Sequence, residues 1–205
     1  MAARIFQSNK RYTFSDYFDL RYPPEEIIGE LGYSLSVKAL VFPETHRAYD
    51  EATERLQTTY YELLPKVSLN SEIAKREFMI APLLYEVLRN VDARLNIEYP
   101  IDVDERLSGS LDYLIRARQA LVVVEAKKGD LDRGFTQLAA ELIALDQYME
   151  DREDPVFYGA ITIGELWRFT SLARAPKHLT RDIHTYRFPE DTGDLFGILY
   201  GILQG

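Results

Sequence analysis

Residues 109–126 constrain the fold of this chain most strongly, because they hold two strand-like segments with almost no chain between them. The second segment, residues 120–126, contains the run Leu-Val-Val-Val, which would be apolar on both faces, as is typical of a buried central strand. The gap at Arg118 leaves room only for a short turn, so the two segments should pair as an antiparallel hairpin. This hairpin predicts the centre of a β-sheet.

The hairpin also brings three charged residues together. Pairing residues that are equidistant from the midpoint between positions 118 and 119 sets Asp112 opposite Glu125. Glu125 and Lys127 are two residues apart on a strand, so their side chains emerge on the same face. Two adjacent carboxylates are costly unless a cation lies between them, and Mg²⁺ or Mn²⁺ suits such oxygen ligands. The hairpin therefore predicts a metal site, with Lys127 placed to orient a water or to neutralise charge on a phosphate.

The rest of the chain predicts an α/β protein with a mixed central sheet flanked by helices. Helical periodicity and capping signals predict helices that begin at about Thr13 and Pro24 and others over about 45–64, 70–90, 131–150 and 194–203. Apolar alternation predicts further strands over about 35–39, 95–103, 156–163 and 165–172. Pro82 should bend or break its helix. We expect a core of residues 70–205, with residues 1–69 as a helical N-terminal extension packed on it.

Composition limits the class of protein. The 205 residues suffice for one substantial core. The absence of cysteine excludes disulfides and thiolate metal sites and favours a reducing cytoplasm. His46, His178 and His184 lack ligand spacing, which makes a histidine-rich zinc site a poor expectation. No apolar run is long enough to span a membrane and the N-terminus lacks a signal-peptide core, so we expect a soluble cytoplasmic protein.

The net charge of −9 argues against a protein that coats nucleic acid generally. A metal-binding cleft itself needs carboxylates, however, and a locally basic rim can coexist with an acidic remainder. The basic residues that would contact a phosphate backbone near the predicted site are Lys75, Arg76, Arg116, Lys128 and Arg133. Acidity therefore weakens the expectation of a nucleic-acid substrate without removing it.

Three pieces of sequence resemble the active-site signature of the PD-(D/E)xK nuclease superfamily. They are Gly109-Ser-Leu-Asp112, Val-Val-Val-Glu125-Ala126-Lys127, and Gln137 in the helix that follows. Leu111 stands where the family has a proline before its aspartate. The resemblance implies a restriction-endonuclease-like αβββαβ core, which matches the order of elements read from the residues alone.

The resemblance also implies roles for individual residues. Asp112, Glu125 and Ala126 would contribute metal ligands, Lys127 would be the catalytic lysine, and Gln137 would support the site near the substrate backbone. It further implies Mg²⁺ or Mn²⁺ as the cofactor. Each short motif alone carries a high risk of chance occurrence, and their combined order carries the resemblance.

Two further segments are similar to the nuclease-like N-terminal part of type I restriction subunits and related stand-alone proteins. Residues 71–84 resemble their first helix, Asn-Glu…Ile-x-Pro-Leu-Leu, and residues 158–169 resemble their hairpin, Tyr-Gly-x-x-Thr-x-Gly-x-x-Trp-x-Phe. Glu72 would then be the first-helix acid that joins the metal and catalytic set. Glu77 is a rival, because it shares a helical face with the apolar residues Ile73, Ile80 and Leu84.

In the second segment, Trp167 and Phe169 share a strand face and should cover the core rather than stack on bases. Thr162 and Gly164 should shape the turn before them.

We therefore expect a Mg²⁺-dependent endonuclease or exonuclease that hydrolyses DNA phosphodiester bonds. The alternative is a catalytically silent nuclease-fold module that acts in binding or regulation. A metal-free acid and base pair of the glycosidase kind is a poor third, because side-by-side carboxylates with a lysine leave no clear room for a sugar. The sequence leaves open a homodimer or a larger complex.

Overall fold

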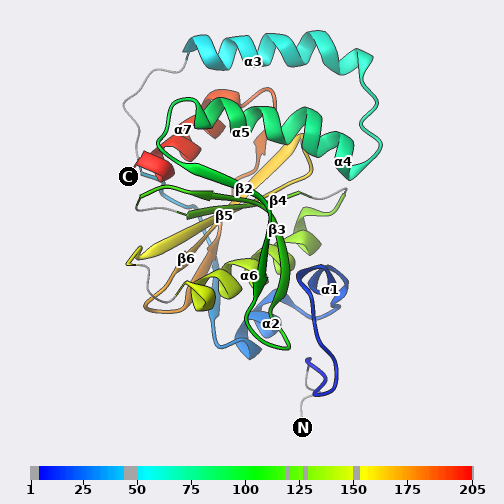
Figure 1. Ribbon diagram of the computed structural model, residues 1–205, viewed down its shortest axis with the longest axis vertical. Coiled ribbons are helices and arrows are strands. Elements are labelled where there is room, and N and C mark those ends of the chain that lie inside the picture. The colour runs from blue at the N-terminus through cyan, green and yellow to red at the C-terminus, as the bar shows by residue number, and fades with distance from the viewer. Residues whose placement is uncertain (1–4, 44–49, 119–120, 127–128, 150–152, 205) are drawn as a thin grey trace.

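The computed structural model describes residues 5–43, 50–118, 121–126, 129–149 and 153–204. In these ranges eight strands form one mixed sheet, in the order β1-β7-β6-β5-β4-β3-β2 with β8 beside β6, and helices lie on both of its faces (Figure 1). The strands are β1 (Ser34–Val37), β2 (Arg94–Asp102), β3 (Ser108–Arg116), β4 (Leu121–Ala126), β5 (Val156–Thr162), β6 (Leu166–Ala173), β7 (His178–Arg181) and β8 (Tyr186–Arg187). The helices are α1 (Phe14–Asp19), α2 (Pro24–Glu30), α3 (Asp50–Leu63), η1 (Leu64–Lys66), α4 (Glu72–Lys75), η2 (Arg76–Ile80), α5 (Ala81–Leu88), α6 (Leu131–Tyr148) and α7 (Thr192–Gln204). The predicted α/β class and mixed sheet are confirmed.

Strand β4 lies between its sequence neighbour β3 and the later strand β5. β3 and β4 are antiparallel, from Tyr113 opposite Val124 to Arg116 opposite Leu121, and each pair is equidistant from the midpoint between positions 118 and 119. β4 and β5 are parallel, with α6 as the connecting helix that packs against both. The predicted hairpin and its register are therefore confirmed.

Two apolar layers fill the space on either side of the sheet. One includes α1, α2 and α6, and contains Leu138 and Leu142. The other includes α5 and α7 and contains Val124, Trp167 and Phe169, all fully buried. Trp167 and Phe169 thus cover the core, as the sequence predicts. Because successive strand residues point to opposite faces, the residue after Val124 points toward α6.

The helix predicted over residues 70–90 is interrupted before Pro82. A π-helical turn, η2, separates α4 from α5, and the N–H of Ala81 bonds to the carbonyl of Arg76, five residues earlier. Pro82 has no N–H to donate to the carbonyl of Phe78, and the hydroxyl of Tyr60 donates to that oxygen instead, at 2.5 Å. The predicted break at Pro82 is confirmed, and it takes the form of a wider turn.

This π-helical turn rotates the residues before it relative to those after it. Ile80 and Leu84 are buried, whereas Ile73 is 66% exposed and Glu77 is exposed as well. The predicted apolar face is therefore confirmed for Ile80 and Leu84 and wrong for Ile73, because a uniform helical period does not continue through a π-turn.

The residues before position 70 share the sheet and the core with the rest of the chain. β1 pairs in parallel with β7 at one edge of the sheet, and α1 packs against α6. Gly109 of β3 has a φ of +143°, and a Cβ there would lie 2.8 Å from the ring of Phe14 in α1. Only glycine allows this approach, so Gly109 fixes α1 against β3.

Two strands after β6 are absent from the sequence prediction. β7 has four residues and β8 has two, and both lie beside β6. Such short segments give too little apolar alternation to be recognised. The predicted strands over residues 156–163 and 165–172 and the final helix are confirmed as β5, β6 and α7.

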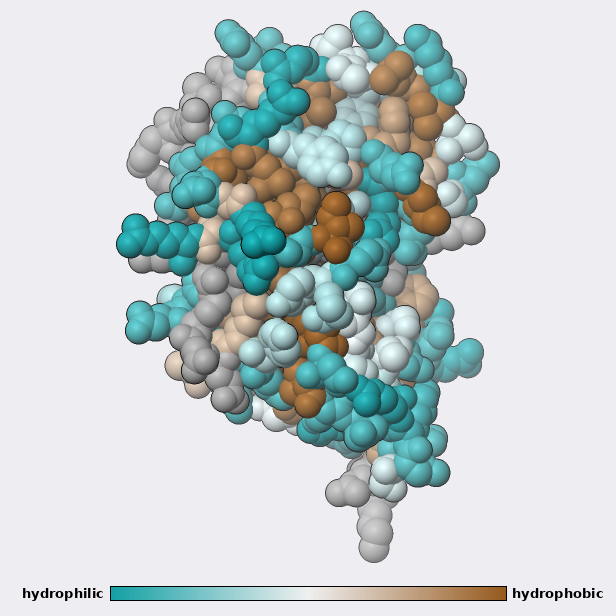
Figure 2. Space-filling view, in the orientation of Figure 1, coloured by the Kyte–Doolittle hydropathy of each residue, from teal (hydrophilic) through white to brown (hydrophobic). Residues whose placement is uncertain are grey.

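No helix in the described part of the chain has the length and apolar character needed to cross a membrane. Figure 2 shows one face of the molecule, where hydrophilic side chains predominate and apolar groups gather mainly in the upper half. The apolar side chains that the structure leaves exposed include Tyr85 on α5 and Ile97 on β2.

Candidate functional site

The two predicted carboxylates lie on neighbouring strands of the sheet. The register of β3 and β4 ends with Tyr113 opposite Val124, and one further step along it would set Asp112 opposite Glu125. Glu125 is buried, and the side chain of Asp112 is 14% exposed. On its other side Glu125 is opposite Ile161 of β5. The two acids therefore lie just beyond the confirmed part of the register, and their direct opposition remains a prediction.

Gln137 joins α6 to this part of the sheet. Its side-chain Nε2 donates to Glu125 Oε1 at 2.7 Å and to Glu141 Oε1 at 2.9 Å, and all three side chains are buried. Gln137 is therefore not a surface residue. Its two amide hydrogens connect two carboxyl groups, one on the strand and one a helical turn further along α6.

Glu141 is the site residue that the sequence reasoning missed. A fully buried glutamate is rare, so a glutamate on a helix is normally assigned to the surface. The signal that could have found it is its position four residues after Gln137, which puts both on one face of α6.

Burial raises the pKa of Glu141 well above its usual range, and the charge of Glu125 acts in the same direction. The charge of Asp112 contributes to this increase in pKa as well, while the hydrogen bond from Gln137 opposes it. Three acids from β3, β4 and α6 therefore interact electrostatically. Closely placed carboxylates of this kind favour either a proton or a cation between them.

Asp112 also contacts the first helical segment. Arg76 Nη1 lies 3.2 Å from Asp112 Oδ1 and 2.7 Å from Glu98 Oε1, and its guanidinium lies over the ring of Tyr113. Burial opposes the charged form of Arg76, but hydrogen bonds and charges from Tyr113, Asp112 and Glu98 raise its pKa. Arg76 thus supplies a positive charge to Asp112.

The first-helix acids differ in exposure. Glu72 is half-buried in the first turn of α4, one turn before Arg76, whereas Glu77 is exposed. Among the residues that the structure describes, no hydrogen bond or ion pair joins Glu72 to Asp112 or Glu125. Glu72 is thus better shielded than its rival, but its predicted role is not tested.

Two predicted site residues are only partly covered. Lys127 lies outside the described residues. For Ala126 the backbone is described: it is the last residue of β4 and is opposite Thr162 of β5. The roles predicted for both therefore remain predictions.

Within the described ranges, no three histidine or acidic side chains form a group that could hold a metal ion as they stand. Mg²⁺ needs only one or two carboxylates, since it keeps several waters. Glu141 Oε2 and Gln137 Oε1 are buried and accept no hydrogen bond from the described residues. Carboxylate and amide oxygens are hard donors, the kind that a small divalent cation prefers.

The turn between β5 and β6 has the structural role predicted for it. The hydroxyl of Thr162 accepts the N–H of Gly164 at 2.9 Å, and Gly164 has a φ of +93°. The indole N–H of Trp167 donates to the carbonyl of Gly164 at 3.1 Å. These bonds fix the start of β6.

The predicted phosphate-contacting residues have other partners. Lys75 pairs with Glu165 at 3.0 Å, Arg76 pairs with Asp112 and Glu98, Arg116 donates to Asn96 at 3.0 Å, and the guanidinium of Arg133 lies over the ring of Phe18. Lys128 lies outside the described residues. None of these contacts indicates a nucleic-acid surface.

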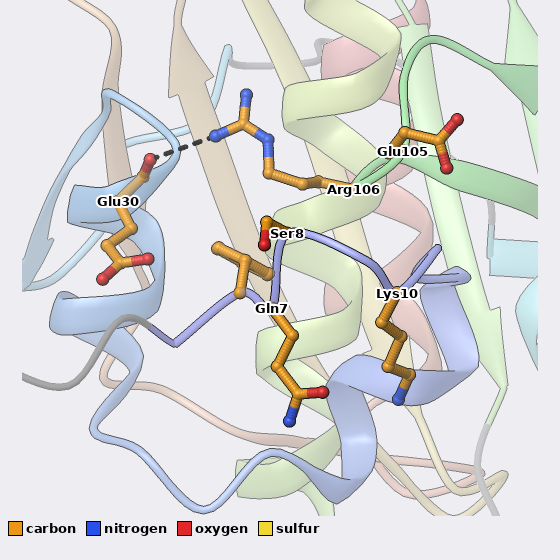
Figure 3. Close-up of a pocket in the computed structure, with 7 residues that line it drawn as sticks. Gln7, Ser8, Lys10, Glu30, Glu105 and Arg106 are labelled. Atoms are coloured by element: carbon orange, nitrogen blue, oxygen red, sulfur yellow. Dashed lines mark hydrogen bonds between the residues drawn. The ribbon is translucent and has the colours of Figure 1, made fainter.

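A separate hollow of about 530 Å³ lies on the N-terminal side of the molecule. It is lined by Phe6, Gln7, Ser8, Lys10, Glu30, Glu105 and Arg106. Figure 3 shows the side chain of Arg106 directed toward Glu30, whose carbonyl accepts a 3.4 Å hydrogen bond from it. No predicted site residue lines this hollow, and its charges are mixed.

Comparison with known proteins found no matching family model and no matching curated protein. An assignment of function to this chain therefore depends on the residues and geometry of the site itself.

Proposed function

We propose that this chain is a metal-dependent phosphodiesterase that cleaves DNA. The observation that carries the proposal is the buried cluster of Glu125, Gln137 and Glu141, with Asp112 on the adjacent strand. Buried acids of this kind are costly and are retained most readily where they bind a cation or take part in chemistry. The α4–α5, β2, β3, β4, α6, β5 order supports a restriction-endonuclease-like core for residues 70–205.

The residues in and around this cluster have different roles in the proposal. Asp112 and Glu125 would hold Mg²⁺ or Mn²⁺, with the carbonyl of Ala126 and the carboxylate of Glu72 as further ligands. Gln137 orients the Glu125 carboxylate through its 2.7 Å hydrogen bond. The bound metal would polarise the phosphate and acidify a water.

Lys127 follows Glu125 by two residues in the sequence, and its ammonium would orient the attacking water or balance charge on the phosphate.

The alternative is a catalytically silent module with the same fold, and the ion pair between Arg76 and Asp112 favours it. A guanidinium beside Asp112 compensates part of the charge that a metal would otherwise compensate. In an active enzyme Arg76 would have to release Asp112 when the metal binds. In a silent module it would remain in place and stabilise the fold.

The test is incubation of the purified protein with single- and double-stranded DNA in Mg²⁺, in Mn²⁺ and in EDTA. Cleavage should require the metal and should fall by at least about a hundredfold in Glu125→Gln and Lys127→Ala, since each removes a group that acts on the reacting phosphate. Glu62→Gln is the matched control, because it makes the same change at an exposed position of α3, away from the proposed site. Cleavage that survives both EDTA and Lys127→Ala would contradict the proposal, and a folded protein without cleavage in either metal would favour the silent module.

A further inference from the structure

Two arginines of the sheet converge on one carboxylate at the start of α6. Arg168 of β6 and Arg181 of β7 both donate to the same oxygen of Asp132, Oδ1, and the bond from Arg168 Nη1 is 2.9 Å. The side chain of Asp132 is 72% exposed, whereas those of Arg168 and Arg181 are 21% and 16% exposed. The group therefore has two largely covered cations and one exposed anion, an excess of one positive charge.

Other contacts hold the two guanidinium groups in place. Arg168 donates from Nε and Nη2 to the hydroxyl of Thr185, at 3.3 and 3.1 Å. Arg181 lies over the ring of Phe135, with 4.9 Å between its Cζ and the ring centroid. These contacts do not involve Asp132, so they would persist if its carboxylate turned away. Because the two arginines are largely covered, the loss of Asp132 would have to be compensated by another anion.

The arginine pair lies on the same face of the sheet as the candidate site. Glu125 is opposite Ile161 of β5, and Ile161 is opposite Arg168 of β6. Residues that are directly opposite each other point to the same face. Two strand spacings separate Glu125 from Arg168, which is about 10 Å. This separation of the two strand backbones is within the length of a few nucleotides of DNA.

We infer that Arg168 and Arg181 bind a backbone phosphate of DNA, a few nucleotides from the bond that the site would cleave. The inference rests on the proposed function for the identity of the ligand, but it concerns binding and not cleavage. A phosphate can offer a separate oxygen to each of the two guanidinium groups, whereas Asp132 offers the same oxygen, Oδ1, to both. Asp132 then acts as a competing anion that neutralises the pair in the free protein.

The test is the binding of a fluorescein-labelled DNA duplex in EDTA, measured by fluorescence anisotropy over a range of salt concentrations. Arg168→Gln and Arg181→Gln should each weaken binding roughly tenfold. Each should also reduce the slope of log affinity against log salt by about 0.9. Asp132→Asn should tighten binding, because it removes the competing charge. The matched control is Arg55→Gln, which removes an exposed, ion-paired arginine from α3.

The outcomes separate this inference from the proposed function. If Arg168→Gln and Arg181→Gln bind DNA as the wild type does, or no more weakly than Arg55→Gln, the inference fails even where Mg²⁺-dependent cleavage is intact. If binding depends on the two arginines but no DNA is cleaved, the inference stands and the proposed function fails. Tighter binding by Asp132→Asn cannot result from misfolding, and weaker binding by this variant would overturn the inference. Absence of binding by the wild type overturns it as well.

Discussion

Replacement of Tyr60 by phenylalanine should destabilise the π-helical turn that connects α4 to α5. The Tyr60 hydroxyl is buried and donates to the carbonyl of Phe78 at 2.5 Å and to that of Met79 at 3.2 Å. Pro82 cannot supply the helical N–H that would otherwise bond to Phe78. Burial raises the pKa of Tyr60, so the hydroxyl remains a donor throughout the neutral range.

The magnitude follows from what the substitution leaves behind. The ring stays, and with it the edge-on contacts with Phe78 and Phe188, at centroid distances of 5.2 and 4.5 Å. The loss is therefore the hydrogen bond and the desolvation of a buried carbonyl left without a donor, which together cost about 1–3 kcal/mol. Tyr60→Phe should lower the free energy of unfolding by that amount.

Equilibrium unfolding in urea measures this difference, and the neighbouring Tyr61 supplies the control. Tyr61 is 53% exposed, so Tyr61→Phe should change the free energy of unfolding by less than about 0.5 kcal/mol. If the two variants are equally stable, the Tyr60 hydroxyl does not compensate for Pro82 and the account of the π-turn is incorrect.

Two further substitutions test the N-terminal half of the fold. Gly109→Ala should destabilise the protein by about 1–3 kcal/mol in the same urea assay, since the alanine Cβ would lie 2.8 Å from the ring of Phe14. A variant of unchanged stability would show that α1 does not pack closely on β3. Asp104 accepts hydrogen bonds from the N–H groups of Arg106 and Leu107, and although burial opposes it, these bonds lower its pKa below 3.8. The charged Asp104 carboxylate therefore contributes stability above pH 3.8, and this contribution is lost as the pH falls through the lower pKa of the folded state. Asp104→Asn should be less stable than the wild type at pH 6 and equally stable in strong acid. A difference in stability that persists in acid would contradict this.

The hairpin of β3 and β4 was predictable because local sequence determines it. A turn of two or three residues leaves one register, and a continuous apolar strand requires a central position in the sheet. The opposition of Asp112 and Glu125 follows from these two facts, with no knowledge of the remaining chain. The structure agrees up to the pair of Tyr113 with Val124, one step before the acids.

Contacts between elements distant in the sequence were not predictable in the same way. Gln137 and Glu141 are turned toward Glu125 by the packing of α6 across the sheet, which depends on apolar residues throughout both layers. Likewise, β1 joins the sheet by pairing with β7, whose four residues carry almost no pattern of apolar alternation. The exposure of Ile73 results from the π-helical turn, which the periodicity of the sequence does not predict.

The acidic composition of the chain does not describe the charge that a substrate would meet at the candidate site. Glu141 is buried, and its raised pKa favours the neutral form, so it contributes little negative charge there. On the same face Arg168 and Arg181 exceed the charge of Asp132 by one. A polyanion responds to the local field within about a Debye length, roughly 8 Å at physiological ionic strength. A net charge of −9 therefore does not by itself exclude a phosphate-binding surface.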